Sequence, residues 1–204
     1  MSFGKFLSFA GACAVLAAKS VALDFTPQET WRALEGVRIP VLLFSDPIGK
    51  IRYQPPGNWN YNGGGPVFTM YPPNTAEAFM KFCIIAHAPG VPEITAFPTQ
   101  NLASWSQQSY VPADAQEVKL LDENPSPFTI NGKPSREFVF TYQATGRQFQ
   151  TSVAVLDWSA REHFAVITTA RATDFKAVHD AGVSSLFSWN LRKTSESPVT
   201  AQRQ

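Results

Sequence analysis

Strict alternation of residue types in three neighbouring segments restricts the fold of this chain more than any other feature. In residues 138–142, 149–155 and 164–168, every second residue is aromatic or β-branched. Successive side chains of a strand point to opposite faces of a sheet, so this pattern predicts three half-buried strands. Because only short turn sequences, 144–147 and 158–161, separate the segments, they should form an antiparallel meander.

Helices are predicted on either side of the meander in the sequence. Pro98 can begin a helix that continues through Leu102 and Trp105, whose spacing forms one buried stripe. Thr173 or Asp174 can cap a second helix, whose stripe consists of Phe175, Val178, Gly182, Leu186 and Trp189. Shorter strands are expected over 41–44, 51–53, 67–71, 78–87 and 117–121. These elements predict an α+β fold, with helices packed on the faces of an antiparallel β-sheet.

Two further segments have strong local signals. Residues 26–29, with the sequence Thr-Pro-Gln-Glu, combine an N-cap residue, a proline at the first helical position and a glutamate at the third. With Gly36 as a stop signal, they predict a helix over 27–35. Residues 63–66, Gly-Gly-Gly-Pro, are expected to form an irregular loop, because glycine and proline both disfavour regular strands.

The first 22 residues have the organisation of a secretory signal peptide. A basic start ending at Lys5 precedes an apolar run, 6–18, that is too short to span a bilayer as a transmembrane anchor. Small residues end at Ala22, so cleavage there would free Leu23. We therefore expect a periplasmic or secreted protein whose segments are a signal peptide (1–22), an N-terminal helix and lead-in (23–38), one domain (39–191) and a polar flexible tail (192–204).

Other interpretations of this N-terminal segment stay open. Cleavage after Ala17 or Ala18 satisfies the same preference for small residues. Residues 10–13, Ala-Gly-Ala-Cys, resemble part of a bacterial lipoprotein signal, which would place a lipid anchor on Cys13. Alanine in place of the usual leucine at Ala10, and the short apolar run before the cysteine, count against the lipid anchor. A buried core helix is disfavoured because apolar residues surround it on all sides.

Charge and cysteine content limit the partners and the means of stabilisation. The chain has 17 Lys and Arg against 16 Asp and Glu, and removing Lys5 and Lys19 with the signal leaves 15 against 16. The absence of a basic excess or stripe argues against nucleic acid as a partner. Cys83 then remains as a single cysteine, so no intrachain disulfide can form. Its apolar surroundings, 81–86, predict a buried thiol.

Two motifs stand out in this pattern: an entry segment, 53–59 (Tyr-Gln-Pro-Pro-Gly-Asn-Trp), and a turn, 131–134 (Asn-Gly-Lys-Pro). Together with the order of hairpin, helix, meander and helix over roughly 40–190, they resemble the PsbP-like superfamily, including its bacterial DcrB-like members. The resemblance implies an α/β sandwich and a non-enzymatic accessory or binding role. It implies no functional residue, and the glycines 63–65 and the connection 87–98 do not map onto it.

The residue pattern contains no recognisable catalytic or metal-binding set. The histidines His87, His163 and His179 lack the short spacings of zinc ligands. Asp157, Glu162 and His163 form the nearest approach to an acid/base cluster, and they would suit an exported hydrolase only beside a groove. The nucleophile motif Gly-x-Ser-x-Gly is absent, and the glycine run lacks the lysine of a phosphate loop. We therefore expect no catalytic residue, no metal, no cofactor and no enzymatic activity.

Aromatic residues provide the candidate binding surface. Tyr53, Trp59, Tyr61 and Tyr71 bracket the glycine-rich run, and Trp158 lies at a predicted turn. Aromatic side chains offer a large contact area at a small entropic cost. These residues are therefore predicted to bind a protein partner of the cell envelope, or a small apolar ligand in a pocket between sheet and helix. Packing against the end of the sheet is the alternative for all of them.

Overall fold

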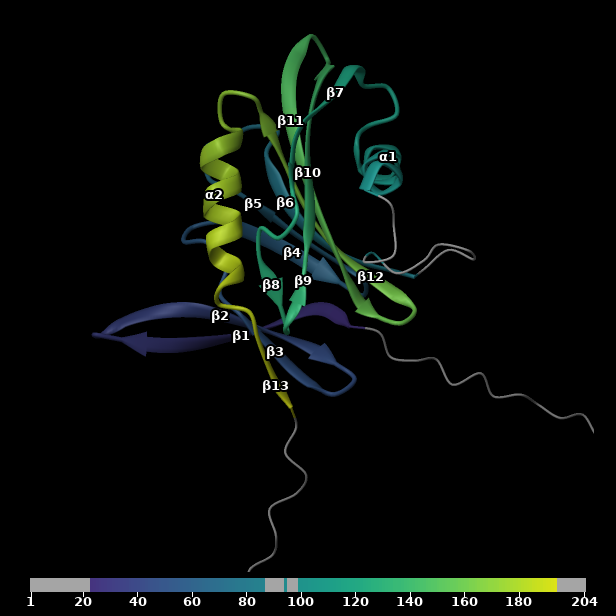
Figure 1. Cartoon of the computed structure of the whole chain (residues 1–204). Coiled ribbons are helices and arrows are strands. Elements are labelled where there is room, and N and C mark those ends of the chain that lie inside the picture. The colour runs from purple at the N-terminus through teal and green to yellow at the C-terminus, as the bar shows by residue number, and fades with distance from the viewer. Residues whose placement is uncertain (1–22, 87–93, 95–98, 194–204) are drawn as a thin grey trace, which may run out of the picture.

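A seven-stranded antiparallel sheet forms the central layer of the molecule (Figure 1). The computed structural model describes residues 23–86, 94 and 99–193. Across the sheet, the strands follow the order β4 (Asn60–Gly64), β5 (Val67–Tyr71), β6 (Phe79–Ala86), β12 (Glu162–Arg171), β11 (Arg147–Ser159), β10 (Arg136–Ala144) and β7 (Gln116–Asn124). Strands β10, β11 and β12 pair as consecutive antiparallel neighbours. The predicted meander is thereby confirmed.

A second, four-stranded sheet covers part of one face of the central sheet (Figure 1). Its order is β1 (Asp24–Leu34), β2 (Val37–Asp46), β3 (Gly49–Tyr53) and β13 (Asn190–Lys193). Helix α2 (Phe175–Leu186) packs on the same face, whereas helix α1 (Thr99–Tyr110) packs on the opposite one. A short hairpin of β8 (Thr129–Ile130) and β9 (Lys133–Pro134) completes the fold. The architecture is rich in β-structure and consistent with the predicted α+β class.

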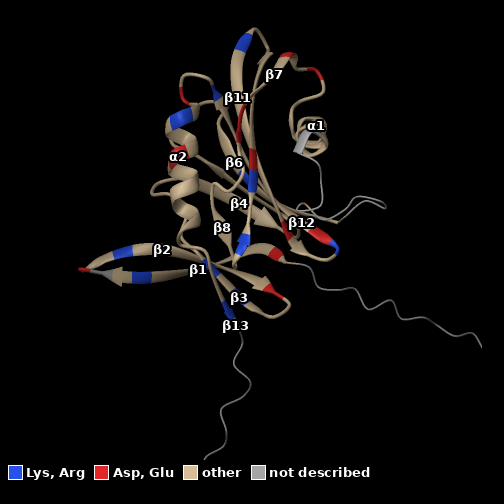
Figure 2. Cartoon of the chain, in the orientation of Figure 1, with Lys and Arg blue, Asp and Glu red and all other residues tan. Residues whose placement is uncertain are grey.

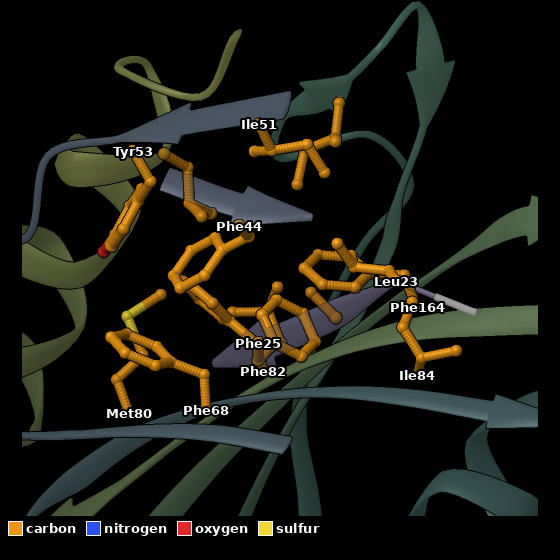
Figure 3. Packing of buried hydrophobic residues seen from close by; sticks show 14 of the residues in the cluster. Leu23, Phe25, Phe44, Ile51, Tyr53, Phe68, Met80, Phe82, Ile84 and Phe164 are labelled. Carbon is orange, nitrogen blue, oxygen red and sulfur yellow. The ribbon is translucent and has the colours of Figure 1, made fainter. Parts of the chain in front are cut away.

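The core between the two sheets is rich in aromatic rings (Figure 3). The Phe25 ring of β1 lies 5.2 Å from the Phe44 ring of β2 and 6.2 Å from the Phe82 ring of β6, between centroids. Alternation along β6 directs Phe82 into this core and Cys83 to the face covered by α1. The Cys83 thiol is buried, as predicted. Each buried phenylalanine contributes about 1.5–3 kcal/mol, so this cluster holds the two sheets together.

Strand β1 replaces the helix predicted over 27–35. The predicted cap residue Thr26 donates its hydroxyl to Asp24 Oδ1 (2.8 Å), and its backbone amide donates to the same oxygen (2.9 Å). The capping chemistry therefore forms a local turn at Asp24. Pro27 lies where the pairing with β2 shifts register, so its missing amide costs no ladder hydrogen bond. Pairing with β2 and burial of Phe25 outweigh the helix signals.

The glycine-rich run is also a strand and a tight turn, where an irregular loop was predicted. A Cβ at Gly63 would lie 2.6 Å from the Phe25 carbonyl oxygen and 2.6 Å from the Phe68 ring. Gly65, with φ of +54°, accepts a hydrogen bond from the Phe25 amide (2.8 Å) and donates one to Asp24 Oδ1 (2.9 Å). The missing side chains let the β4–β5 hairpin contact the β1 backbone directly.

The last predicted helix ends earlier than expected. Helix α2 stops at Leu186, and Trp189, which was predicted to extend its stripe, packs against the aromatic core. Residues 190–193 then form β13, paired with β3, although a polar tail was predicted from residue 192. The chain returns to the four-stranded sheet because Leu191 lies opposite Ile51 and joins the same core.

Several predictions fall on residues outside those that the structure describes. These are the signal peptide and its cleavage site, the lipid anchor at Cys13, His87 and the tail from residue 194. Within the described residues, neither helix has the length and apolar character needed to span a bilayer.

Candidate functional site

An apolar cavity of about 480 Å³ opens beside the C-terminal end of α1. It lies on the α1 side of the central sheet, where the β10–β11 hairpin approaches the connection between β5 and β6. Its wall includes Tyr71, Phe79, Tyr110, Tyr142, Ala144 and Phe149. The volume falls within the range of roughly 300–1,000 Å³ typical of small-molecule sites.

Pairing of β10 with β11 positions two of these aromatic walls. Tyr142 lies directly opposite Phe149, and their rings stack with centroids 5.8 Å apart and planes 16° apart. The Tyr142 hydroxyl shares a hydrogen bond with Thr151 Oγ1 (3.2 Å), which in turn shares one with Thr169 Oγ1 (2.9 Å). Each of these three hydroxyls has a hydrogen-bond partner within the protein, and the bonds hold the Tyr142 ring in place as part of the cavity wall.

Tyr110 lines the cavity, but its hydroxyl is buried away from accessible space. This hydroxyl has no hydrogen-bond partner among the described residues. Burial, with a smaller effect of Cys83, raises the pKa of Tyr110, so the hydroxyl stays protonated and can donate. The Trp105 ring packs edge-on against it, with centroids 5.8 Å apart. A buried donor without a partner costs about 1–3 kcal/mol.

Charged groups at the rim of the cavity are paired with one another. Glu77, which lines the cavity, places Oε2 2.8 Å from Arg147 Nη1 and 2.6 Å from Arg171 Nη2. Hydrogen bonding from Arg171, followed by that from Arg147, lowers the pKa of Glu77 and keeps the carboxylate ionised. The Glu77 carboxylate is thereby neutralised, and the two arginines leave one net positive charge at the rim.

The structure disperses the five aromatic residues that were predicted to form a binding surface. Tyr71 lines the cavity and is 42% exposed, whereas Tyr53 is fully buried in the core. Trp59 and Tyr61 are half-buried and pack against that core. Trp158 lines a separate cavity. The site therefore retains Tyr71 of the predicted set, and its other aromatic walls come from segments that the prediction did not consider.

Two of the dispersed tyrosines are engaged within the chain. The Tyr53 hydroxyl shares a hydrogen bond with Ser185 Oγ (2.6 Å), which joins β3 to α2. The Tyr61 hydroxyl donates to Glu29 Oε1 (2.6 Å) and joins β4 to β1. Burial, together with the Glu29 carboxylate, raises the pKa of Tyr61 to about 12. Both hydroxyls connect elements of the fold.

The cavity beside Trp158, of about 440 Å³, lies at the other end of the molecule. Leu23, Lys133 and Leu191 contribute to its wall. Lys133 Nζ donates to the Trp158 carbonyl oxygen (2.6 Å), so the Asn-Gly-Lys-Pro turn is anchored to β11. This contact gives the turn motif a structural role.

The structure brings together two residues of the candidate acid/base cluster, Asp157 and His163, but not the third, Glu162. Asp157 and His163 are cross-strand neighbours on the α1 side of the sheet, where His163 is 2% exposed and its ring lies 5.6 Å from that of Trp105. Glu162, the adjacent residue in β12, points to the other face and accepts a hydrogen bond from Ser159 Oγ (3.1 Å). Among the described residues, histidine, cysteine and carboxylate side chains form no group of three able to hold a metal ion.

A buried ionic contact was not anticipated from the sequence. Glu137 of β10 is 4% exposed, and its Oε1 lies 2.7 Å from His179 Nε2 of α2. The Ser152 hydroxyl donates to the same oxygen. The signal in the sequence was weak: Glu137 is a charged residue at the start of an otherwise apolar strand, next to the alternating pattern. Its partners are contributed by a different strand and a helix.

Comparison with known proteins gives a likeness at the level of fold. No protein-family model matches the chain, and no curated protein matches it. The solution structure of cyanobacterial PsbP (CyanoP) from Synechocystis is similar, with 10% sequence identity, coverage of 90% of this chain and 99% of that one, and a TM-score of 0.46. Cyanobacterial PsbP is thus a structural neighbour of this chain. The PsbP-like resemblance drawn from the sequence agrees with this finding.

Two other solved structures are similar to a comparable degree. A Pseudomonas aeruginosa protein of unknown function has 14% identity and a TM-score of 0.45, over 82% of this chain and 99% of that one. LpqN, involved in cell envelope biogenesis of Mycobacterium tuberculosis, has 10% identity and a TM-score of 0.45, over 81% of this chain and 91% of that one. At these identities, the likeness concerns the fold alone.

Proposed function

We propose that this chain is a non-catalytic, exported binding protein that holds a small apolar ligand in the cavity beside α1. The observation that carries this proposal is the cavity of about 480 Å³, whose wall is apolar and includes five aromatic side chains and whose rim carboxylate is held by two arginines. Small-molecule sites in proteins combine an apolar wall with a few fixed polar groups. Stacked Tyr142 and Phe149 provide the rigid wall, and the Tyr110 side chain adds a further aromatic contact.

A non-catalytic role is supported by the placement of the ionisable residues. Glu162 points to the face of the sheet opposite His163, and His163, although it lies beside Asp157, is only 2% exposed and therefore out of reach of a substrate. The aromatic cavity is bordered by Glu77, whose carboxylate is occupied by two arginines. General acid/base catalysis requires a group of matched pKa that is free to exchange a proton with the substrate.

The binding proposal is tested by filling the cavity. Ala144 lies in its wall near the end of β10, and Ala144→Trp would place an indole in that space. Ala160→Trp is the matched control, because Ala160 is an exposed residue of the β11–β12 turn. An apolar fluorophore such as N-phenylnaphthylamine should bind the wild type and the control with equal affinity. Its affinity for Ala144→Trp should fall about tenfold or more, the equivalent of losing roughly 1.4 kcal/mol of contact.

A second measurement addresses the natural ligand. Protein purified from its own cell envelope should show a bound adduct in native mass spectrometry, and the adduct should be missing from Ala144→Trp but present in Ala160→Trp. An apo mass for the wild type, together with equal fluorophore affinity in all three proteins, would overturn the proposal.

Export is the second part of the proposed function and rests on the sequence of residues 1–22. Cleavage after Ala22 would place the new N-terminus at Leu23, whose side chain is 1% exposed within the core. N-terminal sequencing of the protein from the envelope fraction should therefore begin at Leu23. An intact N-terminus in the cytosolic fraction would contradict export.

A further inference from the structure

Three arginines converge on a small cavity at the outer face of the four-stranded sheet. The cavity has a volume of about 230 Å³ and is lined by Arg32, Arg52 and Arg192 together with Gln54, Phe187 and Asn190. It shares no lining residue with the aromatic cavity beside α1. Figure 2 shows basic residues on β1 and β13 of this sheet.

Strand pairing explains why these arginines meet. Arg52 of β3 lies directly opposite Asn190 of β13, and Arg192 follows two residues later on the same strand face. The residues between them, Ile51 on β3 and Leu191 on β13, belong to the aromatic core. The arginines therefore project from the face of the sheet that points away from the core. Arg32 extends from β1 on this same face.

The positive charge of this cluster is not compensated within the described part of the chain. Arg136, Arg147 and Arg171 each form an ion pair with a glutamate, whereas Arg32, Arg52 and Arg192 form none. The other lining residues are neutral. A guanidinium stays protonated at any physiological pH, so the three groups repel one another unless an anion joins them.

The chemistry of the lining favours a phosphate group as that anion. Guanidinium groups bind phosphate oxygens through paired N–H donors. The combined positive charge of several guanidinium groups is matched better by a phosphate group than by a single carboxylate. The side-chain amides of Gln54 and Asn190 can donate further hydrogen bonds. A cavity of 230 Å³ accommodates a phosphate with part of the molecule that bears it.

Phe187 indicates that the phosphate is attached to an organic group. Its side chain is 81% exposed at the end of α2 and lines the same cavity. The connection that carries it is fixed, because Ser188 Oγ accepts a hydrogen bond from the Gln54 amide (2.8 Å) and donates one to the Ser185 carbonyl oxygen (2.7 Å). An exposed phenyl ring held beside a basic cavity offers an apolar contact to whatever carries the anion.

We propose that Arg32, Arg52 and Arg192 form a binding site for the phosphate group of an organic phosphate, with Phe187 in contact with its organic part. The same chemistry is present in a soluble phosphate ester and in the headgroup of an anionic phospholipid. The site is independent of the proposed apolar ligand.

The experiment uses the mature chain and titrates three probes by calorimetry at low ionic strength: inorganic phosphate, phenyl phosphate, and vesicles of phosphatidylglycerol with phosphatidylcholine vesicles as reference. Phenyl phosphate should bind more tightly than inorganic phosphate, because it also contacts Phe187. The affinity should fall about tenfold in Arg52→Gln and in Arg192→Gln, the loss expected for one charge-assisted pair. Arg161→Gln is the control, because Arg161 is an exposed arginine of the β11–β12 turn that forms no ion pair with another described residue.

The outcomes separate the sources of the phosphate. Binding of phenyl phosphate with the expected variant pattern supports a soluble ester. Binding only to phosphatidylglycerol vesicles, with the same pattern, supports a lipid headgroup. If none of the probes binds, or if Arg161→Gln weakens binding as much as the site variants do, the proposal is overturned. Arg192 is exposed, so its variant keeps the test valid if substitution of the half-buried Arg52 disturbs folding.

Discussion

His179 Nε2 of α2 lies 2.7 Å from Glu137 Oε1 of β10, and this contact joins the helix to the central sheet through a buried ionic group. The Ser152 hydroxyl of β11 donates to the same oxygen, so three elements meet at one carboxylate. The Phe175 ring stacks on His179, with centroids 5.3 Å apart, and covers it. Since buried charges require partners, the position of α2 depends on this contact.

Removing the imidazole should destabilise the fold. His179→Ala would leave the Glu137 carboxylate buried with Ser152 as its remaining partner. The unfolding free energy should fall by about 2 kcal/mol, below the 3–5 kcal/mol typical of a fully buried pair, because the His179 side chain is 19% exposed. Urea denaturation measures this change. Lys176→Ala, which removes the exposed ion pair with Asp180 on the same helix, should change it by less than about 0.5 kcal/mol. Equal effects of the two variants would contradict a special role for His179.

The same carboxylate should make stability sensitive to acid. Burial raises the pKa of Glu137, but hydrogen bonds with His179 and Ser152 and the charge of His179 outweigh it, so the pKa lies below the ordinary value of 4.5. A carboxyl whose pKa is lowered on folding stabilises the protein above the unfolded pKa, and this contribution is lost as the pH falls through the folded pKa. The difference in unfolding free energy between wild type and Glu137→Gln should therefore shrink as the pH is lowered from 4.5.

This pH effect is separable from general acid denaturation. The unfolding free energy of Asp114→Asn, a change at an exposed position, should differ little from that of the wild type across the same pH range. Chemical denaturation at a series of pH values gives both comparisons. If the difference in unfolding free energy between wild type and Glu137→Gln grew as the pH fell, a lowered pKa of Glu137 in the folded protein would be contradicted.

The glycine run should reject alanine at Gly63 and tolerate it at the next position, Gly64. A Cβ at Gly63 meets the Phe25 carbonyl oxygen and the Phe68 ring at 2.6 Å, so Gly63→Ala must move backbone. Its expected cost is about 2 kcal/mol, as for other overpacked sites. At Gly64 the nearest atom is Thr26 Oγ1, at an ordinary 3.7 Å, so Gly64→Ala should be nearly neutral. Thermal unfolding of both variants tests this difference, and equal midpoints would contradict the close approach of β4 to β1.

The hydroxyls of two tyrosines that line the cavity should have opposite effects on stability. Tyr110→Phe removes a buried hydroxyl that has no partner among the residues the structure describes, and should raise the unfolding free energy of the ligand-free protein by about 1 kcal/mol. Tyr142→Phe removes a hydroxyl bonded to Thr151 and should lower it by about 1 kcal/mol. Guanidinium denaturation measures the unfolding free energies of the two variants and of the wild type. Loss of stability in Tyr110→Phe would mean that its hydroxyl has an internal partner in solution.

Sequence patterns predicted elements whose signals are local and regular. The meander of β10, β11 and β12 followed from period-two alternation, and α1 and the first turns of α2 followed from apolar spacing. The binding site was predicted less well. Tyr71 does line the aromatic cavity. Tyr53 does not, because α2 covers the inner face of β3 and buries its side chain. The residues that flank Tyr53 along the chain gave no indication of this contact.

By itself, the sequence determined the meander of β10, β11 and β12, because the pleat of a strand imposes its period on the residues that form it. Tertiary structure decided which segments meet. It turned the capping signals at Thr26 into part of a strand, since pairing with β2 and burial of Phe25 outweigh a local hydrogen bond. It also brought Arg32 and Arg192 to one cavity, because strand order, which no local pattern encodes, places β1 and β13 in the same sheet.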